Sequence, residues 1–336
     1  MSLEILWAQF LAAALLILFA APRLTRNAEI IAARRNISDN WIGLILLASV
    51  TSLPELAAGI SSVSAADAPD IAVGAVFGSC VFNLAMLVVL DFAVRGESVY
   101  RQARQAHILS AGFGTMLIGI AGLTLMVRDL GLTLAIGHIG ATSLVIVIVY
   151  VVATRAIHNY EAKIRERAGE AVRKTPTEPL GRAQLMFALA ALAIILGGLW
   201  LPVVGAAIAD QTFLDRSIMG TIFIAAATSL PELSISLAAL RLGSVNMAIA
   251  NLLGSNLFNI LILAIEDAVY TGGPLLGAAS NIHAVTAMAA VIMCGVVIAG
   301  LLYRPKTRLF KMVGWTSIAL FSVYILNVYL IFFTTR

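Results

Sequence analysis

The sequence predicts an all-α polytopic membrane protein of ten transmembrane helices, arranged as two inverted five-helix repeats. The first observation is composition, because the 336 residues are 60% hydrophobic and only 12% charged, whereas soluble domains carry about 25% charged residues. The second is a series of apolar segments, each long enough to cross a bilayer. The third is a pair of motifs that occurs once in each half of the chain.

Ten apolar segments account for most of the chain, and about 20 such residues span a membrane. Their predicted ranges are 3–21, 41–65, 71–92, 107–127, 131–153, 184–208, 217–240, 245–269, 282–303 and 312–333. The first segment lacks the basic residues that open a signal peptide, since Glu4 is the only charge near its start. We therefore expect it to be a retained helix.

Two motifs are written twice. "TSLPEL" occurs at 51–56 and 228–233, and "FGSCVFN" at 77–83 corresponds to "LGSNLFN" at 253–259. The copies lie 177 residues apart at the prolines and 176 apart at the serines. Because five helices is an odd number, the second unit must cross the membrane in the opposite sense to the first. Secondary transporters often have this arrangement, with their site at the repeat interface.

The repeats divide the chain into a first unit at 1–153, a polar linker at 154–183 and a second unit at 184–336. The Glu161–Arg165 spacing supports a short helix in the linker. Of the 22 Lys and Arg residues, all but Arg128, Arg216 and Arg336 fall on the linker's side of the membrane. The positive-inside rule makes that side cytoplasmic and places both termini outside. Arginine outnumbers lysine 18 to 4. This ratio is typical of a prokaryote with a GC-rich genome and so favours a bacterial inner membrane.

Each "TSLPEL" motif places a proline and a carboxylate inside an apolar segment. Proline lacks an N–H group and displaces the carbonyl four residues earlier, so we expect free carbonyl groups at Val50 and Ala227. In a bilayer, irregular backbone survives only inside protein or beside a cavity. A carboxylate at mid-membrane costs about 2.5–3.5 kcal/mol on insertion scales and is a functional candidate by default. The alternative is that the prolines are ordinary kinks and the glutamates are structural.

Oxygen-bearing side chains recur at one spacing, a hydroxyl followed four residues later by a carboxylate or amide on the same helix face. The pairs are Thr51 and Glu55, Ser79 and Asn83, Thr228 and Glu232, and Ser255 and Asn259. Ca²⁺ takes six to eight oxygen ligands, whereas zinc and copper prefer His and Cys. The pattern therefore predicts a site for a hard cation, in which the charge of two glutamates is neutralised by one Ca²⁺. Two or more Na⁺, or protons, could replace that Ca²⁺.

The pattern "TSLPE…GS(C/N)xFN" in both halves resembles the α-repeats of the sodium/calcium exchanger family, within the cation/Ca²⁺ antiporter superfamily, in its prokaryotic ten-helix form. The resemblance spans nearly the whole chain. It implies that Glu55 and Glu232 bind Ca²⁺ and compete for Na⁺, while Thr51 and Thr228 ligate through backbone carbonyl and hydroxyl. Residues implied to line adjoining Na⁺ sites or to complete the first repeat's site are Ser52, Ser79, Ser229, Ser255 and Asn83.

The sequence departs from the family pattern at several positions. Val50 and Ala227 stand where the family usually has glycine, and Cys80 replaces the asparagine that Asn256 retains. Asn259 stands where many prokaryotic members have aspartate, which leaves the Na⁺ stoichiometry open.

Three further acids, Asp91, Glu266 and Asp267, end the third and eighth segments. We expect them to be solvated at the membrane interface, the alternative being an external gate or a proton-linked accessory site. The histidines are scattered without paired spacing, and packing or interfacial roles are expected for His107, His138, His158 and His283.

The leading functional prediction is alternating-access exchange of Ca²⁺ for Na⁺, with the first and sixth segments moving past a fixed core. The alternatives are an H⁺-coupled exchanger and a cation channel or sensor. No nucleophile–base pair or metalloprotease motif occurs, so no enzymatic activity and no cofactor are expected. The expected partners are inorganic cations and the lipid bilayer, with no nucleic acid, and a monomer is compatible with the sequence.

Overall fold

The computed structural model describes residues 2–34, 50–94, 97–128, 134–168, 178–305, 308–309 and 313–334. Within these residues, nine helices are long and apolar enough to cross a membrane. The predicted segment 41–65 is described only from Val50, and its first nine residues lie outside the described residues, as does Arg336. The predicted all-α polytopic fold is confirmed.

The helices of the first half are α1 (Leu3–Arg34), α4 (Leu53–Ser64), α5 (Pro69–Ala93), α6 (Val99–Gln102), α7 (Ala106–Val127) and α8 (Ala141–Ala168). Those of the second half are α9 (Leu180–Gln211), α10 (Arg216–Ile218), the π-helical segment η3 (Met219–Ile224), α11 (Ala225–Arg241), α12 (Val245–Val269), α13 (Leu275–Ala278), α14 (His283–Tyr303) and α15 (Trp315–Thr334). Short antiparallel hairpins lead into α8 and α15, formed by β1 (Ala135–Ile136) with β2 (Ile139–Gly140) and by β3 (Arg308–Leu309) with β4 (Val313–Gly314).

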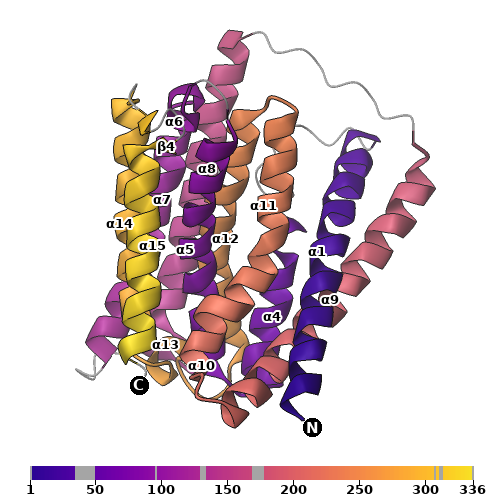
Figure 1. Cartoon of the computed structure of the whole chain (residues 1–336), viewed down its shortest axis with the longest axis vertical. Coiled ribbons are helices and arrows are strands. Elements are labelled where there is room, and N and C mark those ends of the chain that lie inside the picture. Colours follow the sequence, from indigo (N-terminus) through magenta and orange to yellow (C-terminus); the bar gives the residue numbers. More distant parts are fainter. Residues whose placement is uncertain are drawn as a thin grey trace.

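The helices form one bundle, with the start of α1 and the end of α15 at one end and the end of α8 and the start of α9 at the other (Figure 1). We call these the terminal end and the linker end. In the most apolar 18-residue stretch of each helix, 72% of α5 and 78% of α12 is buried, against 28% of α1 and of α15. The third helix of each repeat therefore forms the centre, and α1 lies beside α9 at one edge (Figure 1).

The contacts at the ends of α5 and α12 show that these corresponding helices run in opposite directions. Asn246, in the first turn of α12, accepts a hydrogen bond from the Arg104 amide, which follows α5 and α6 (2.7 Å). Asp70, in the first turn of α5, accepts one from the Ser280 amide, which follows α12 and α13 (2.6 Å). Each helix therefore begins where the other ends, as an inverted repeat requires.

Several helix bounds differ from the prediction. The predicted helix at 131–153 is wrong at both ends, because the β1–β2 hairpin occupies 135–140 and α8 spans Ala141–Ala168, into the predicted linker. α1 continues to Arg34, so the predicted end at residue 21 is wrong, and α9 begins at Leu180 rather than at 184. Pro22 does not end α1, although it removes a helix hydrogen bond. The Arg23 guanidinium donates to the Phe19 carbonyl within the same turn. At the linker end, Arg26 forms an ion pair with Glu178, just before α9.

Asp91, at the end of α5, is fully buried (0% exposed). Its carboxylate accepts hydrogen bonds from the Ser98 hydroxyl (2.8 Å) and the Val99 amide (3.1 Å) around α6. It also accepts from the Gly314 amide (3.0 Å) and the Ser317 hydroxyl (2.8 Å) at the start of α15. Asp91 therefore connects the third helix of the first repeat to the fifth helix of the second.

Asp267 has the same role in the other repeat. It accepts hydrogen bonds from the Gly140 amide (2.8 Å), the Ser143 hydroxyl (2.5 Å) and the Leu275 amide (2.6 Å). It is 2% exposed, and Glu266 beside it is 0% exposed. The expected interfacial solvation of these three acids is wrong, because backbone and hydroxyl donors from distant segments replace water at the two aspartates.

Two of the four histidines are also related by the repeat, which corrects the prediction that they are scattered. His107 Nε2 lies 3.2 Å from Asn246 Oδ1, and His283 Nε2 lies 3.1 Å from Asp70 Oδ1. Both pairs join the fourth helix of one repeat to the third helix of the other, 176 residues apart in the sequence. The partner is a neutral amide at the linker end and a carboxylate at the terminal end.

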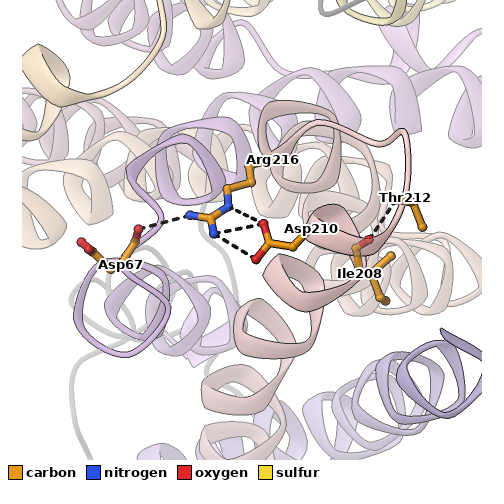
Figure 2. A network of polar contacts seen from close by, with 5 residues as sticks. All are labelled: Asp67, Ile208, Asp210, Thr212 and Arg216. Carbon is orange, nitrogen blue, oxygen red and sulfur yellow. Dashed lines mark hydrogen bonds and ion pairs between the residues drawn. The ribbon is translucent and has the colours of Figure 1, made fainter. Parts of the chain in front are cut away.

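Arg216 joins segments from both halves at the terminal end (Figure 2). Its guanidinium donates to both carboxylate oxygens of Asp210, near the end of α9 (3.1 and 3.2 Å), and to the Asp67 carbonyl in the α4–α5 turn (3.4 Å). The Arg216 and Asp210 side chains are 39% and 58% exposed, so solvent screens this pair and its contribution to stability is small.

Replacing either buried aspartate should destabilise the fold. Asp91→Ala and Asp267→Ala each leave several buried donors without an acceptor, and each unsatisfied buried group costs about 1–3 kcal/mol. We expect a loss of about 3 kcal/mol or more per variant, measured as the thermal unfolding midpoint in detergent by intrinsic fluorescence. Glu97→Ala is the control, because Glu97 pairs with Arg101 at the surface. Equal midpoints for Asp267→Ala and Glu97→Ala would contradict the assigned role.

Candidate cation-binding site

The two "TSLPEL" motifs take different backbone conformations. Helical residues at Val50 and Thr51 are interrupted by a turn at Ser52, and Pro54 lies in the first turn of α4, where its missing N–H group costs nothing. Pro231 instead lies inside α11, which runs without interruption from Ala225 to Arg241. In the second repeat the irregular backbone is the π-helical turn of η3, which precedes α11. Such turns occur frequently at functional sites.

All ten predicted site side chains are buried. The largest exposed fraction among them is 8%, at Glu55, and Glu232 is 0% exposed. The others are Thr51, Ser52, Ser79, Asn83, Thr228, Ser229, Ser255 and Asn259. They lie on α5, α11, α12 and the segment around the start of α4, which pack against one another in the interior of the bundle.

Direct contacts connect the motif of one repeat to that of the other. The Ser229 hydroxyl donates to Glu55 Oε1 at 3.0 Å. Glu55 and Glu232 interact electrostatically, and the Ser52 and Ser255 hydroxyls lie beside the Glu232 carboxylate. The structure therefore brings both glutamates and three of the serines together, with each repeat supplying part of the group.

Much of the oxygen in this cluster has no hydrogen-bond partner. Unpartnered atoms within the described structure are Glu55 Oε2, both Glu232 carboxylate oxygens, the hydroxyls of Ser52, Ser79 and Ser255, and the amide oxygens of Asn83 and Asn259. Buried polar groups are normally satisfied in native proteins, and an unpaired buried charge is costly. The arrangement therefore fits a bound cation that these oxygens would coordinate.

The donor chemistry favours a hard cation. Within the described residues, no group of three or more His, Cys, Asp or Glu side chains is placed to hold a metal ion. The cluster instead combines two carboxylates with hydroxyl and amide oxygens, which suit Ca²⁺ or Na⁺ better than zinc or copper.

Amide hydrogen bonds fix the crossing of α5 and α12 beside this cluster. Asn83 Nδ2 donates to Asn256 Oδ1 at 3.1 Å, and Asn256 Nδ2 donates to the Cys80 carbonyl at 3.1 Å. Cys80 and Asn256 occupy equivalent positions in the repeats, so the departure at Cys80 falls at this crossing. At this crossing the second repeat contributes the side-chain amide of Asn256, and the first repeat contributes the backbone carbonyl of Cys80.

Asn251 is a contributor that sequence reasoning missed. Its amide donates to the Glu232 carbonyl (3.3 Å) and to the Ser236 hydroxyl (3.0 Å). It therefore holds the backbone of α11 at the glutamate against α12. The available signal was its position one helical turn before Ser255, on the same face of α12.

Glycine permits close helix contact beside the site. A Cβ atom on Gly78 would lie 2.2 Å from the Thr221 carbonyl oxygen in η3. One on Gly198 in α9 would lie 2.6 Å from Ala57 Cβ in α4. Small residues thus set the distance between α5 and η3 and between α9 and α4, as expected for helices packed in a membrane.

The inverted helical repeats and the shared interior cluster of carboxylates define an integral membrane protein with a buried candidate site for a cation. The family model described as "Sodium/calcium exchanger protein" matches residues 5–156 and 183–333. The chain belongs to this family, which consists of membrane antiporters that exchange Ca²⁺ and transport inorganic cations. The resemblance seen in the duplicated motifs is confirmed.

Relatives in several organisms are similar along most of their length. The chain is 27% identical over 271 residues to the inner membrane protein YrbG of Escherichia coli (strain K12), covering 78% of each chain. It is 28% identical over 289 residues to the putative antiporter CaxA of Alkalimonas amylolytica, covering 82% of this chain and 84% of the relative.

Two solved structures share the fold. A structure of the sodium-calcium exchanger NCX_Mj matches with a TM-score of 0.62 at 22% identity, covering 98% of this chain and 99% of the other. The H⁺/Ca²⁺ exchanger CAX matches with a TM-score of 0.70 at 14% identity, covering 98% of this chain and 85% of the other.

Gly78→Ala should damage the site through packing. The added methyl group would overlap the Thr221 carbonyl and force α5 away from η3, next to Ser79. We expect a loss of about 1–3 kcal/mol in stability together with a loss of ⁴⁵Ca²⁺ flux in proteoliposomes. Gly112→Ala on α7 is the matched control, since its Cβ would meet nothing within 4 Å and alanine favours a helix. Equal behaviour of the two variants would contradict the packing argument.

Proposed function

We propose that this protein exchanges Ca²⁺ for Na⁺ across the membrane by alternating access at the Glu55–Glu232 cluster. The observation that supports this most directly is the set of unpartnered oxygens around the two glutamates, contributed by both repeats. Two carboxylates carry a charge of −2, which one Ca²⁺ or two monovalent cations neutralise. In this proposal Thr51, Thr228 and the carbonyls of Val50 and Ala227 complete the coordination.

In this proposal, the charge of the cluster determines when the site can reorient between the two sides of the membrane. An empty site holds two buried charges without partners, and closing it away from water costs free energy. A bound cation removes that cost, so only a loaded site reorients. Ca²⁺ moving one way must then be replaced by other cations moving back, which couples the two fluxes.

The moving part in this proposal is the pair formed by α1 and α9, which pack against each other along the bundle edge (Figure 1). Their contacts with the rest include small residues, such as Gly198 against Ala57. Because small residues have short side chains, helices packed through them have few interlocked side chains that would have to separate when one helix slides past another. We propose that this pair slides past α4 and α11 and exposes the cluster to either side in turn.

The proposed orientation has the terminal end outside and the linker end in the cytoplasm, in a bacterial inner membrane. The excess of Lys and Arg at the linker end supports the orientation, and the similarity to an inner membrane protein of Escherichia coli supports the choice of membrane. We further propose that the protein acts as a monomer, without a cofactor and without enzymatic activity.

An H⁺-coupled exchange of Ca²⁺ is the second candidate. It is favoured by the proximity of Glu55 to Glu232, and Asn259, at a position where the family pattern often has aspartate, leaves the Na⁺ stoichiometry open. Two adjacent carboxylates titrate as a coupled pair, so protons compete readily for the cluster. A channel is less well supported, because the ligands gather in one interior cluster and not along a pore.

Neutralising either glutamate should abolish exchange. In Glu55→Gln or Glu232→Gln the site carries half its charge and no longer balances a divalent cation. We expect ⁴⁵Ca²⁺ uptake into proteoliposomes under an imposed Na⁺ gradient to fall to the level of empty liposomes. Glu97→Gln, which neutralises an exposed glutamate of the linker end, should keep the wild-type rate. Wild-type uptake in either site variant would refute the assignment.

The coupling ion is identified by applying one gradient at a time. We expect rapid ⁴⁵Ca²⁺ uptake with a Na⁺ gradient and equal pH on both sides. Uptake with a pH gradient in Na⁺-free buffer should be near background, because the proposal assigns the return flux to Na⁺. The opposite result would replace Na⁺ by H⁺ and leave the glutamate site intact.

A further inference from the structure

Glu266 is a buried carboxylate that the proposed exchange does not use. It lies on α12, it is 0% exposed, and neither carboxylate oxygen has a hydrogen-bond partner within the described structure. Its neighbour Asp267 is equally buried and accepts three hydrogen bonds. A carboxylate without donors in an apolar surrounding must be neutralised by a proton or a cation.

The Glu266 carboxyl group occupies a niche against α4 that only glycine leaves open. A Cβ atom on Gly59 would lie 1.8 Å from Glu266 Oε1 and 2.7 Å from its carboxyl carbon. The side chain is therefore directed into the α4–α12 interface and away from the bundle surface.

This interface leads to the central cluster. On α12, Glu266 follows Ser255 and Asn259 at helical spacing, so the three side chains share one face. On α4, Gly59 lies one turn after Glu55, about 6 Å along the axis. Glu266 thus lies on the same pair of helices as the central cluster, displaced toward the terminal end.

The other repeat lacks the corresponding group. The position equivalent to Glu266 is Leu90, and the position equivalent to Gly59 is Ser236, whose hydroxyl bonds the Ala248 carbonyl. Because the repeats are inverted, that equivalent position lies toward the linker end. The extra carboxylate therefore makes the terminal-end side of the cluster differ from its linker-end side.

The titratable and charged groups around this part of α12 leave Glu266 without a counter-charge. Neither oxygen of Glu266 bonds to any of them in the part of the chain that the structure describes. They are Glu55 on α4, Asp70 on α5 with its partner His283 on α14, Arg128 at the end of α7, His138 before β2, Glu232 on α11 and Asp267 on α12.

We propose that Glu266 is a proton-binding site on the terminal-end side of the central cluster, and that its proton regulates cation entry from that side. The carboxylate takes a proton from the solution at the terminal end and becomes a neutral acid. A cation that enters the α4–α12 interface displaces this proton, which returns to the same solution. This inference depends on the proposed exchange in one respect only, because that exchange supplies the cation that enters.

The consequence is a pH dependence confined to one side. The charged form of Glu266 attracts a cation toward the cluster, and the neutral form does not. Na⁺-driven Ca²⁺ uptake should therefore slow severalfold when the solution at the terminal end is changed from weakly alkaline to weakly acidic. The same change at the linker end, where Leu90 stands in the equivalent place, should have a much smaller effect.

The test measures ⁴⁵Ca²⁺ flux in proteoliposomes of a single protein orientation, with the pH of each side fixed separately. Glu266→Gln keeps the shape of a protonated carboxyl group, and Glu266→Leu copies Leu90 of the other repeat. Both should lose most of the terminal-end pH dependence. Asp70→Asn is the matched control, because it removes another carboxylate at the same end and copies Asn246. It should keep the wild-type profile.

A wild-type profile that is flat, or one that both Glu266 variants retain in full, would overturn the proposal. Infrared difference spectra on alkalisation give a second readout that needs no transport. The C=O band of protonated carboxylic acids should lose intensity in Glu266→Gln relative to wild type and to Asp70→Asn. Unchanged intensity would overturn the proposal, whereas the expected loss in a protein without Na⁺-driven flux would reject only the exchange mechanism.

Discussion

The free-energy cost of burying carboxylates inside an apolar bundle governs this structure. Asp91 and Asp267 meet that cost with several backbone and hydroxyl donors each, and they connect the repeats to one another. Glu55 and Glu232 have few such donors and are surrounded by further oxygens. The acids with several hydrogen-bond donors hold the fold together, and the acids that lack donors are the ones to which we assign a bound cation or proton.

The inverted repeat makes departures from symmetry informative. Equivalent residues lie toward opposite ends of the bundle, so an unmatched residue belongs to one side of the membrane. The histidine pairs differ in this way, with Asn246 at the linker end and Asp70 at the terminal end. Glu266 and Leu90 differ likewise. A transporter that works between two solutions of different composition has reason to treat its two faces differently.

The sequence was sufficient for the helices and the duplicated cluster, because bilayer thickness sets segment length and the motifs repeat at one offset. It was not sufficient for Asp267, whose donors Gly140 and Ser143 lie more than a hundred residues away. A signal was present, since "GATS" at 140–143 and "GWTS" at 314–317 are another repeated pair. The end of α1 was missed because Pro22, a helix breaker in isolation, lies inside α1 without ending it.

The pattern of polar connections also separates a densely bonded part of the bundle from the two helices that we propose to move. The Asp91 and Asp267 networks and both histidine pairs connect α5, α7, α8, α12, α14 and α15. None of these bonds involves α1 or α9. Those two helices are held to each other at the linker end through Glu178. α9 contacts the rest through the Ser61 hydroxyl on the Leu199 carbonyl and through the exposed ion pair of Asp210 with Arg216. Few bonds need to break for α1 and α9 to move together, whereas moving α5 against α12 would expose several buried charges. The hydrogen bonds that fix α5 against α12 thus leave out α1 and α9, which supports the proposed sliding of that pair.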